Sequence, residues 1–290
     1  MLKQFQNFRS AHQRTYIAIL SVLIALLLLF ILWFEYNYLP PGKDWVKTFR
    51  PATLELLARR SPYNIPTFYM PPWVLIPFIP LAILPEKIGS LIITDVGLLS
   101  YIFVIRKLKI RPVAAMAFLL CPATIIGLHA ANIDWLIIFG FIMPPPIGLF
   151  LVLLKPQVGA AVALYWLVEA WRLGKVRTTI KTFLPISLAY LLSFAIFGPW
   201  LLKAGELVDK TGYQGYMDIS LWPMSIPIGL VFLVMAIRQR KINFAYMASP
   251  FLSPYVGANS YAVVILGLTP YPLETVVATV GLWIALLAGG

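Results

Sequence analysis

An acidic side chain followed by arginines is the first pattern in the sequence that could do chemistry. Asp44 comes just after the first long apolar run, and Arg59 and Arg60 follow it closely. A carboxylate can serve as a general base, and guanidinium groups bind phosphate through charge-assisted hydrogen bonds. The pattern indicates chemistry on a phosphate-bearing substrate. The commoner interpretation of an isolated Asp44 is an acid in a solvated loop.

Further polar groups interrupt apolar sequence later in the chain. They are Asp95, Lys155, and a group made by His129, Asn132 and Asp134. Ionisable groups at membrane depth are costly unless they are paired or hydrated, so each indicates a functional site or a structural pair inside a bundle. Lys155 has a further alternative, because its long stem can reach the membrane interface.

Several kinds of catalytic site are absent from the sequence. No Gly-x-Gly-x-x-Gly, Walker loop or serine-hydrolase motif is present, so nothing points to nucleotide binding or to ATP. His12 and His129 are the only histidines and Cys121 is the only cysteine, which argues against a histidine or thiolate metal centre. We therefore predict no metal and no cofactor. An enzyme of this kind needs a substrate with its own leaving group, and a lipid-linked donor suits a membrane.

The elements that must position these residues are membrane helices. Of the 290 residues, 60% are hydrophobic and only 12% are charged, which is more apolar surface than a water-soluble globule of this length can hide. Because a span needs about 20 apolar residues, the length accommodates about eight to ten spanning or half-spanning segments. The sequence predicts an all-α fold, a polytopic transmembrane helical bundle forming a single domain over residues 1–290.

The net charge of +12 comes from short basic runs between apolar stretches. The runs are Lys3/Arg9/Arg14, Arg106/Lys107/Lys109/Arg111, Arg172/Lys175/Arg177/Lys181 and Arg238/Arg240/Lys241. Positive loops mark the cytoplasmic face. We expect a multi-pass integral membrane protein of the plasma membrane, with a cytoplasmic N-terminus and no nucleic-acid partner. Loops on the other face would begin near Glu35, His129, Lys203 and Ala258.

The first apolar run, Tyr16–Phe34, is too long for a signal-peptide core, so we expect it to be retained as the first helix. An outer loop of about residues 35–71 follows. Pro51 suits the first turn of a helix. The loop is therefore expected to carry a short interfacial helix over residues 51–60, whose basic end meets lipid phosphates.

Prolines interrupt the later apolar runs, at Pro71/Pro72, Pro77/Pro80, Pro144–Pro146 and Pro250/Pro254. Irregular backbone within a bilayer is tolerated only where protein or a water-filled cavity satisfies its polar groups, so broken or re-entrant helices indicate a cavity. The alternative is that proline is simply common in membrane helices. Apart from the broken run at 135–171, spans are expected at 72–84, 89–105, 183–202, 222–237, 242–255, 261–268 and 275–287.

Several short motifs resemble one family of membrane enzymes. The stretches from Lys43-Asp-Trp to Ser61-Pro-Tyr63, Tyr69-Met-Pro-Pro-Trp73 and Pro80-Leu-Ala-Ile-Leu-Pro85 resemble the opening of the polyprenol-phosphate-dependent glycosyltransferases of family 87, which belong to the C-type membrane glycosyltransferases, GT-C. Leu154-Lys-Pro-Gln157 is similar to the family's mid-chain Lys-Pro motif, and Ser249-Pro to Ser253-Pro-Tyr255 is similar to its late Ser-Pro segment. The order of the matches over residues 43–265 argues against chance.

The resemblance implies a GT-C-like bundle and a hexosyltransferase. A hexose such as mannose would pass from a polyprenyl-phosphate sugar donor to a lipid or glycan acceptor, on the extracytoplasmic side and with inversion. Asp44 would be the general base, and Lys155, Arg59 and Arg60 would bind the donor phosphate. The cavity would include Tyr63, Tyr69, His129, Asn132, Asp134, Gln157 and Tyr255. The family's Gly-Gln-x-Asn is replaced by Ala130-Ala-Asn-Ile-Asp134, so only Asn132 carries over directly.

Two other functions fit the same sequence. A transporter or flippase of a lipid-linked substrate would line its route with Asp95, Lys155 and His129. A non-catalytic membrane scaffold subunit would contact membrane lipids and a partner complex, and would not need Asp44.

Overall fold

The computed structural model describes residues 2–202 and 219–288, which are helical and contain no β-strand, as the sequence predicts. The chain divides into two compact units, Met1–Pro40 and Pro41–Gly290. A single transmembrane domain over the whole chain stays a prediction. Lys203, where one loop was expected to begin, lies outside the described residues.

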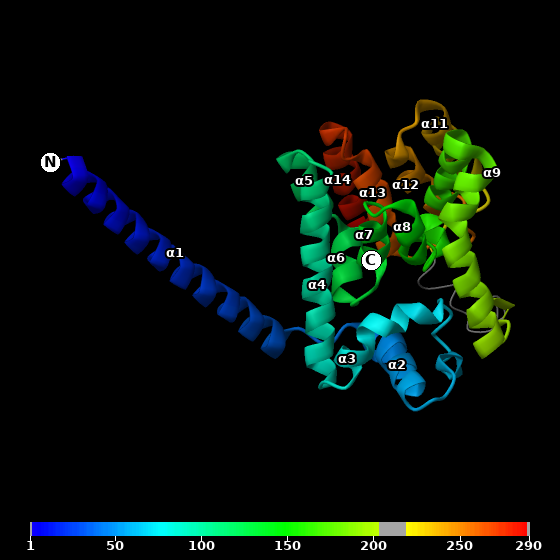
Figure 1. The fold of residues 1–290 in the computed structure, drawn as a ribbon, viewed down its shortest axis with the longest axis horizontal. Coiled ribbons are helices and arrows are strands. Elements are labelled where there is room, and N and C mark those ends of the chain that lie inside the picture. The colour runs from blue at the N-terminus through cyan, green and yellow to red at the C-terminus, as the bar shows by residue number, and fades with distance from the viewer. Residues whose placement is uncertain (1, 203–218, 289–290) are drawn as a thin grey trace. The chain divides into compact units, whose positions relative to one another are not determined.

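The first unit contains one helix, α1, which runs over Leu2–Tyr38 (Figure 1). The helix includes the predicted first span and continues past Phe34 to Tyr38. Leucines, isoleucines and aromatic residues are exposed along it, with Leu23 at 58% and Leu29 at 62%. Its part Tyr16–Tyr38 is long and apolar enough to cross a membrane.

The second unit begins with a series of short helical pieces. In chain order they are a π-helix Trp45–Phe49, α2 Arg50–Leu57, a 3-10 turn Pro62–Asn64, a 3-10 helix Pro72–Phe78 and α3 Ile79–Ala82. The predicted helix over 51–60 therefore exists, although it begins at Arg50 and ends at Leu57. Its buried side chains are Ala52 and Thr53, while Leu57 is exposed.

The remaining helices form the body of the second unit. They are α4 Glu86–Lys107, α5 Pro112–Leu119, α6 Pro122–His129, α7 Asp134–Gly140, α8 Pro145–Val152, α9 Pro156–Phe197, α11 Ile226–Gln239, α12 Ile242–Phe251, a 3-10 helix Ala258–Tyr261, α13 Ala262–Leu268 and α14 Pro272–Ala288. Five of these begin at a proline. Proline suits the first helical position and forces the preceding residue into an extended conformation, so it fixes where each helix starts.

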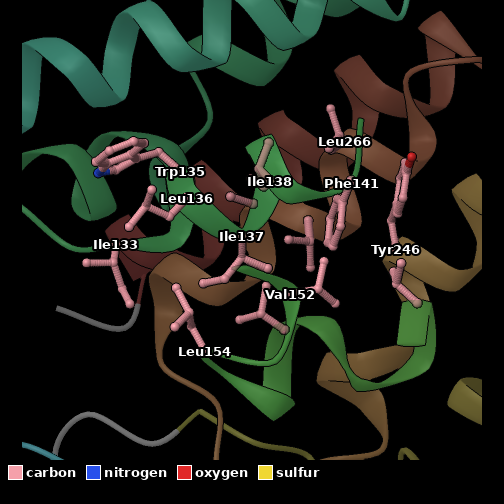
Figure 2. Close-up of a cluster of buried hydrophobic side chains, with 14 of the residues drawn as sticks. Ile133, Trp135, Leu136, Ile137, Ile138, Phe141, Val152, Leu154, Tyr246 and Leu266 are labelled. Carbon is pink, nitrogen blue, oxygen red and sulfur yellow. The ribbon is translucent and has the colours of Figure 1, made fainter. Parts of the chain in front are cut away.

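The core surrounds the two short helices α7 and α8, which pack against each other, with α4 packed on α7 and α9 packed on α8 (Figure 1). Ile137 and Ile138 of α7 are fully buried, and Phe141 stacks on Tyr246 of α12 with ring centroids 4.4 Å apart (Figure 2). The prolines at 144–146 separate α7 from α8, as the sequence predicts. Each piece has only seven or eight residues, so neither can cross a bilayer alone.

Among the described residues, three helices are long and apolar enough to cross a membrane, and a fourth crossing exists if α5 and α6, bent by 50°, count as one broken span. The three are Tyr16–Tyr38, Glu86–Lys107 and Pro156–Phe197. Several other expected spans are shorter, since α12 has 10 residues and α13 has seven. Gly174 and Lys175 have non-helical backbone angles within the 42-residue α9, so the bend falls inside a basic run.

Three basic runs lie at one end of the second unit. Arg172 donates to the carbonyl of Ile237 at 2.8 Å, and Arg240 lies 3.9 Å from Glu169, so the runs on α9 and after α11 meet. Figure 1 shows the junction of α4 and α5 on the same side as α11, with α2 and α3 at the opposite end. This arrangement agrees with a common face for the three runs.

Candidate functional site

A glycine holds the loop that carries Asp44 against the turn after α6. A Cβ atom on Gly42 would lie 2.5 Å from Ala131 Cβ and 2.6 Å from the carbonyl carbon of Ala130. The close approach lets the Asp44 amide donate to the carbonyl of Ala130 at 2.9 Å. Trp45 follows, fully buried, and its indole donates to the carbonyl of Glu86 at 3.0 Å. Asp44 is therefore anchored on both sides.

A tight turn at the end of α6 positions Asn132. Ala131 has a left-handed φ of 50°, its amide donates to Leu128, and the Asn132 amide donates to Gly127 at 2.9 Å. These two bonds form a Schellman motif, which closes the helix and reverses the chain. The side-chain amide of Asn132 then donates to one carboxylate oxygen of Asp44.

A buried ion pair lies next to Asn132. The ammonium group of Lys155, immediately before α9, is 2.6 Å from Asp134 Oδ1 and 2.9 Å from Asn132 Oδ1. Lys155 is 6% exposed and Asp134 is 1% exposed. Asn259 donates to the second carboxylate oxygen of Asp134. Removing one partner of such a pair typically costs about 3–5 kcal/mol, because the other charge stays buried alone.

Asp44, Asn132, Lys155 and Asn259 border one cavity of about 810 Å³. Its polar wall contains Asp44, Asn132, Lys155, Gln157 and Asn259, and tyrosines Tyr69, Tyr255 and Tyr261 also line it. Its apolar wall includes Ile126 of α6 and Leu282, Ala285 and Leu286 of α14. Leu286 is 46% exposed, so the apolar wall reaches the outer surface of α14. The cavity suits a molecule with a polar group and a long apolar part.

The carboxyl of Asp44 is half-buried, and its environment changes its acidity. Burial raises the pKa of Asp44, because the charged form loses hydration, while Lys155 and the hydrogen bond from Asn132 act in the opposite direction. Nearby Asp134 raises the pKa further. A carboxylate with a raised pKa is a stronger base than one in free solution.

The structure brings together six of the residues that the sequence selected, since Asp44, Tyr69, Asn132, Lys155, Gln157 and Tyr255 all line the cavity. Asp134 does not line it but pairs with Lys155. The other four selected residues lie elsewhere. Tyr63 stacks on Trp200 at 5.2 Å and donates to the carbonyl of Met70. His129 is exposed at the end of α6.

Arg59 and Arg60 border a separate pocket of about 450 Å³, together with Leu56, Ser61, Asn64, Ile196 and Phe197. Arg60 makes a two-bond ion pair with Glu55, at 2.7 and 2.9 Å. The structure therefore does not place these arginines beside Lys155 at the cavity.

Asn259 is a cavity residue that sequence reasoning missed. It lies in the 3-10 helix Ala258–Tyr261, and it reaches Asp134 across 125 positions of sequence. A signal for it was present, because Gly257 to Ser260 interrupts an apolar stretch with small and polar residues. Nothing local in that pattern indicates contact with Asp134.

Among residues 2–202 and 219–288, no group of three or more histidine, cysteine, aspartate or glutamate side chains is close enough to hold a metal ion. No family model, curated protein or solved structure matches the chain. The resemblance to glycosyltransferase family 87 therefore stays a prediction from the sequence motifs.

Proposed function

We propose that this protein is an integral-membrane, multi-pass, GT-C-like glycosyltransferase of the plasma membrane that uses a polyprenyl-phosphate sugar as donor. A hexose would pass to a lipid or glycan acceptor on the extracytoplasmic side. The observation that carries the proposal is the meeting of Asp44, Asn132 and Lys155 in one cavity with an apolar wall.

In this reaction Asp44 accepts the proton of the acceptor hydroxyl. The hydroxyl oxygen forms a bond to the anomeric carbon as the bond from that carbon to the phosphate oxygen breaks, and the polyprenyl phosphate leaves. Attack from the opposite face inverts the anomeric centre. Asn132 supports the step by holding the carboxylate of Asp44 through its amide.

The charges of Asp44, Asp134 and Lys155 favour proton transfer to Asp44 while the phosphate leaves. With Asp44 ionised, Asp44, Asp134 and Lys155 together carry one negative charge, and protonation of Asp44 makes the cluster neutral. Negative charge grows on the departing phosphate at the moment when the charge of Asp44 is lost. Lys155 has three N–H groups, two of which bond Asp134 and Asn132, so one remains for the phosphate.

The apolar wall supports a lipid-linked donor. Leu282, Ala285 and Leu286 line the cavity from α14, and neighbouring Ile284 and Leu287 are 62% and 76% exposed. A polyprenyl chain could therefore run from the membrane along α14 while its phosphate lies near Lys155.

The test is sugar transfer by the full chain in proteoliposomes that contain radiolabelled polyprenyl-phosphate mannose and lipids extracted from the expressing cell. Asp44→Asn is expected to fold and insert, and to lower transfer by about 10²–10⁴-fold, the usual contribution of a general base. Asp95→Asn is the matched control, because Asp95 is also half-buried but does not line the cavity.

Unchanged transfer in Asp44→Asn would remove Asp44 from the mechanism. Movement of labelled lipid across the bilayer without a new glycosidic bond would favour the flippase instead. Copurification with another complex, together with no effect of changing Asp44, would favour the scaffold.

A further inference from the structure

A cationic pocket lies at the end of α9, apart from the cavity. It is bordered by Arg59, Arg60, Ser61 and Asn64 after α2, and by Ile196 and Phe197 at the end of α9. The ring of Tyr63 makes an edge contact with the ring of Phe197, with centroids 5.8 Å apart, and so supports the contact between the segment after α2 and the end of α9. Figure 1 shows α2 beside the late part of α9, at the end of the unit opposite α11.

The backbone at Arg59 ends α2 and places the arginine side chain at the pocket. The Arg59 amide donates to Leu56 and the Arg60 amide donates to Glu55, at 3.0 and 2.9 Å, which completes a Schellman motif at the end of α2. Arg59 has the left-handed φ of 57° at the position that glycine usually fills. A residue with a Cβ is less favourable than glycine in this conformation, so the arginine is held at some cost to the fold.

The two arginines differ in what they bind. Both oxygens of Glu55 are engaged by Arg60, and Asn64 also donates to Glu55 at 3.2 Å. The hydrogen bonds lower the pKa of Glu55 to about 2, so this carboxylate stays ionised and paired. Arg59 is exposed and takes part in none of the ion pairs that the described residues form. Among residues 2–202 and 219–288, the guanidinium of Arg59 therefore has no carboxylate partner in an ion pair.

The neighbouring surface is apolar and belongs to a candidate span. Leu191, Leu192 and Ile196 of α9 are 63%, 62% and 68% exposed, and α9 is long and apolar enough to cross a membrane. The end of a span lies at the level of the lipid headgroups. Arginine provides a planar set of donors that matches phosphate geometry.

We propose that this pocket binds the phosphate headgroup of an anionic phospholipid, with Arg59 as the cation and Ile196 against the acyl chain. Zwitterionic lipid should bind more weakly, because the residues that line the pocket include no carboxylate for the choline group and nearby Glu55 is paired with Arg60. This site is distinct from the proposed donor cavity. A negative result for lipid binding would therefore not contradict the role of Asp44.

The test uses the purified full chain in detergent, with bound lipid measured by native mass spectrometry and unfolding followed by circular dichroism. The probes are dioctanoyl phosphatidylglycerol, dioctanoyl phosphatidylcholine and inorganic phosphate. Arg59→Gly is expected to weaken phosphatidylglycerol binding about tenfold, as loss of a charge-assisted bond should. The same change is expected to raise the unfolding temperature, because glycine favours the left-handed backbone. Arg59→Asn is a second variant that tolerates this backbone.

Lys109→Gly is the matched control. Lys109 has φ 53°, and its Schellman motif after α4 repeats the same two bonds, from Lys109 to Arg106 and from Ile110 to Ile105. Like Arg59→Gly, the substitution Lys109→Gly removes a cation and should raise the unfolding temperature, but it should leave lipid binding unchanged. The proposal is overturned if Arg59→Gly keeps its affinity, if Lys109→Gly loses as much, or if phosphatidylcholine or inorganic phosphate binds the wild type as tightly as phosphatidylglycerol.

Discussion

At the scale of single residues, the ionisation of Asp44 determines whether this carboxyl can accept a proton in the cavity. Burial raises the pKa of this carboxyl above its ordinary value, and Lys155 offsets part of the rise. A carboxyl with a raised pKa in the folded state binds its proton more tightly there than in the unfolded chain. The folded state therefore gains stability from this group at low pH and loses it as the pH rises through the folded pKa.

The first prediction follows from the direction in which the pKa of Asp44 is shifted. At neutral pH, Asp44→Asn should be at least as stable as the wild type, because it removes the cost of a partly buried charge. Activity should rise with pH through the raised pKa, because only the ionised carboxylate can accept a proton. Thermal unfolding and initial rates measured from pH 4 to 9 would check both statements.

The stability advantage of Asp44→Asn should shrink as the pH falls below the folded pKa of Asp44, where the wild type carries a neutral carboxyl as well. A variant that is clearly less stable than the wild type at pH 7 would contradict the account. So would a rate that stays constant across the acidic range.

At the scale of elements, the site depends on direct packing between two backbone segments, with no side chain between them. Gly42 meets the turn that ends α6, and that turn directs Asn132 toward Asp44. We predict that Gly42→Ala lowers the free energy of unfolding by about 1–3 kcal/mol, the usual cost of overpacking. It should also lower activity, because Asp44 and Asn132 move apart. Chemical denaturation and sugar transfer would measure the two effects.

A second substitution tests the cause of the loss. Ala131→Gly removes the Cβ that would lie 2.5 Å from the methyl group added by Gly42→Ala, but the Ala130 carbonyl carbon and the Ala131 nitrogen remain at 2.6 Å. Because glycine also favours the left-handed φ of 50° at position 131, the double variant is compared with Ala131→Gly alone. Gly42→Ala should cost nearly as much in that background as in the wild type, and a much smaller cost would show that the side chain of Ala131, and not the backbone of the turn, sets the limit.

Only some helix boundaries were predicted from the sequence. The break between α7 and α8 follows the prolines at 144–146, as predicted, whereas the helices that begin at Pro112 and Pro122 were not predicted, and the span expected over 183–202 is part of α9 as far as Phe197. Span number was less predictable, since length alone does not show that Pro72–Phe78 becomes a 3-10 helix. The gathering of Asp44, Asn132 and Lys155 was expected only from the resemblance to a family, whereas the separation of Arg59 from them depends on tertiary packing.

At the scale of the whole molecule, the two ends of the second unit differ in charge and in the helices that lie there. Basic runs gather near α11 and the junction of α4 with α5, while α2 lies at the other end (Figure 1). Since basic residues stay on the cytoplasmic side, the α2 end should face away from the cytoplasm. This end carries the loop that leads into Asp44.

Cysteine labelling in intact cells tests this orientation. Lys47→Cys, on the exposed face of the π-helix after Asp44, should react with a membrane-impermeant maleimide added outside. Lys107→Cys, exposed at the end of α4, should react only after the cells are permeabilised. The native Cys121 is fully buried, so the unmodified chain is the control and should stay unlabelled. Labelling of Lys107→Cys before permeabilisation would reverse the topology and place Asp44 on the cytoplasmic side, where the proposed extracytoplasmic transfer could not occur.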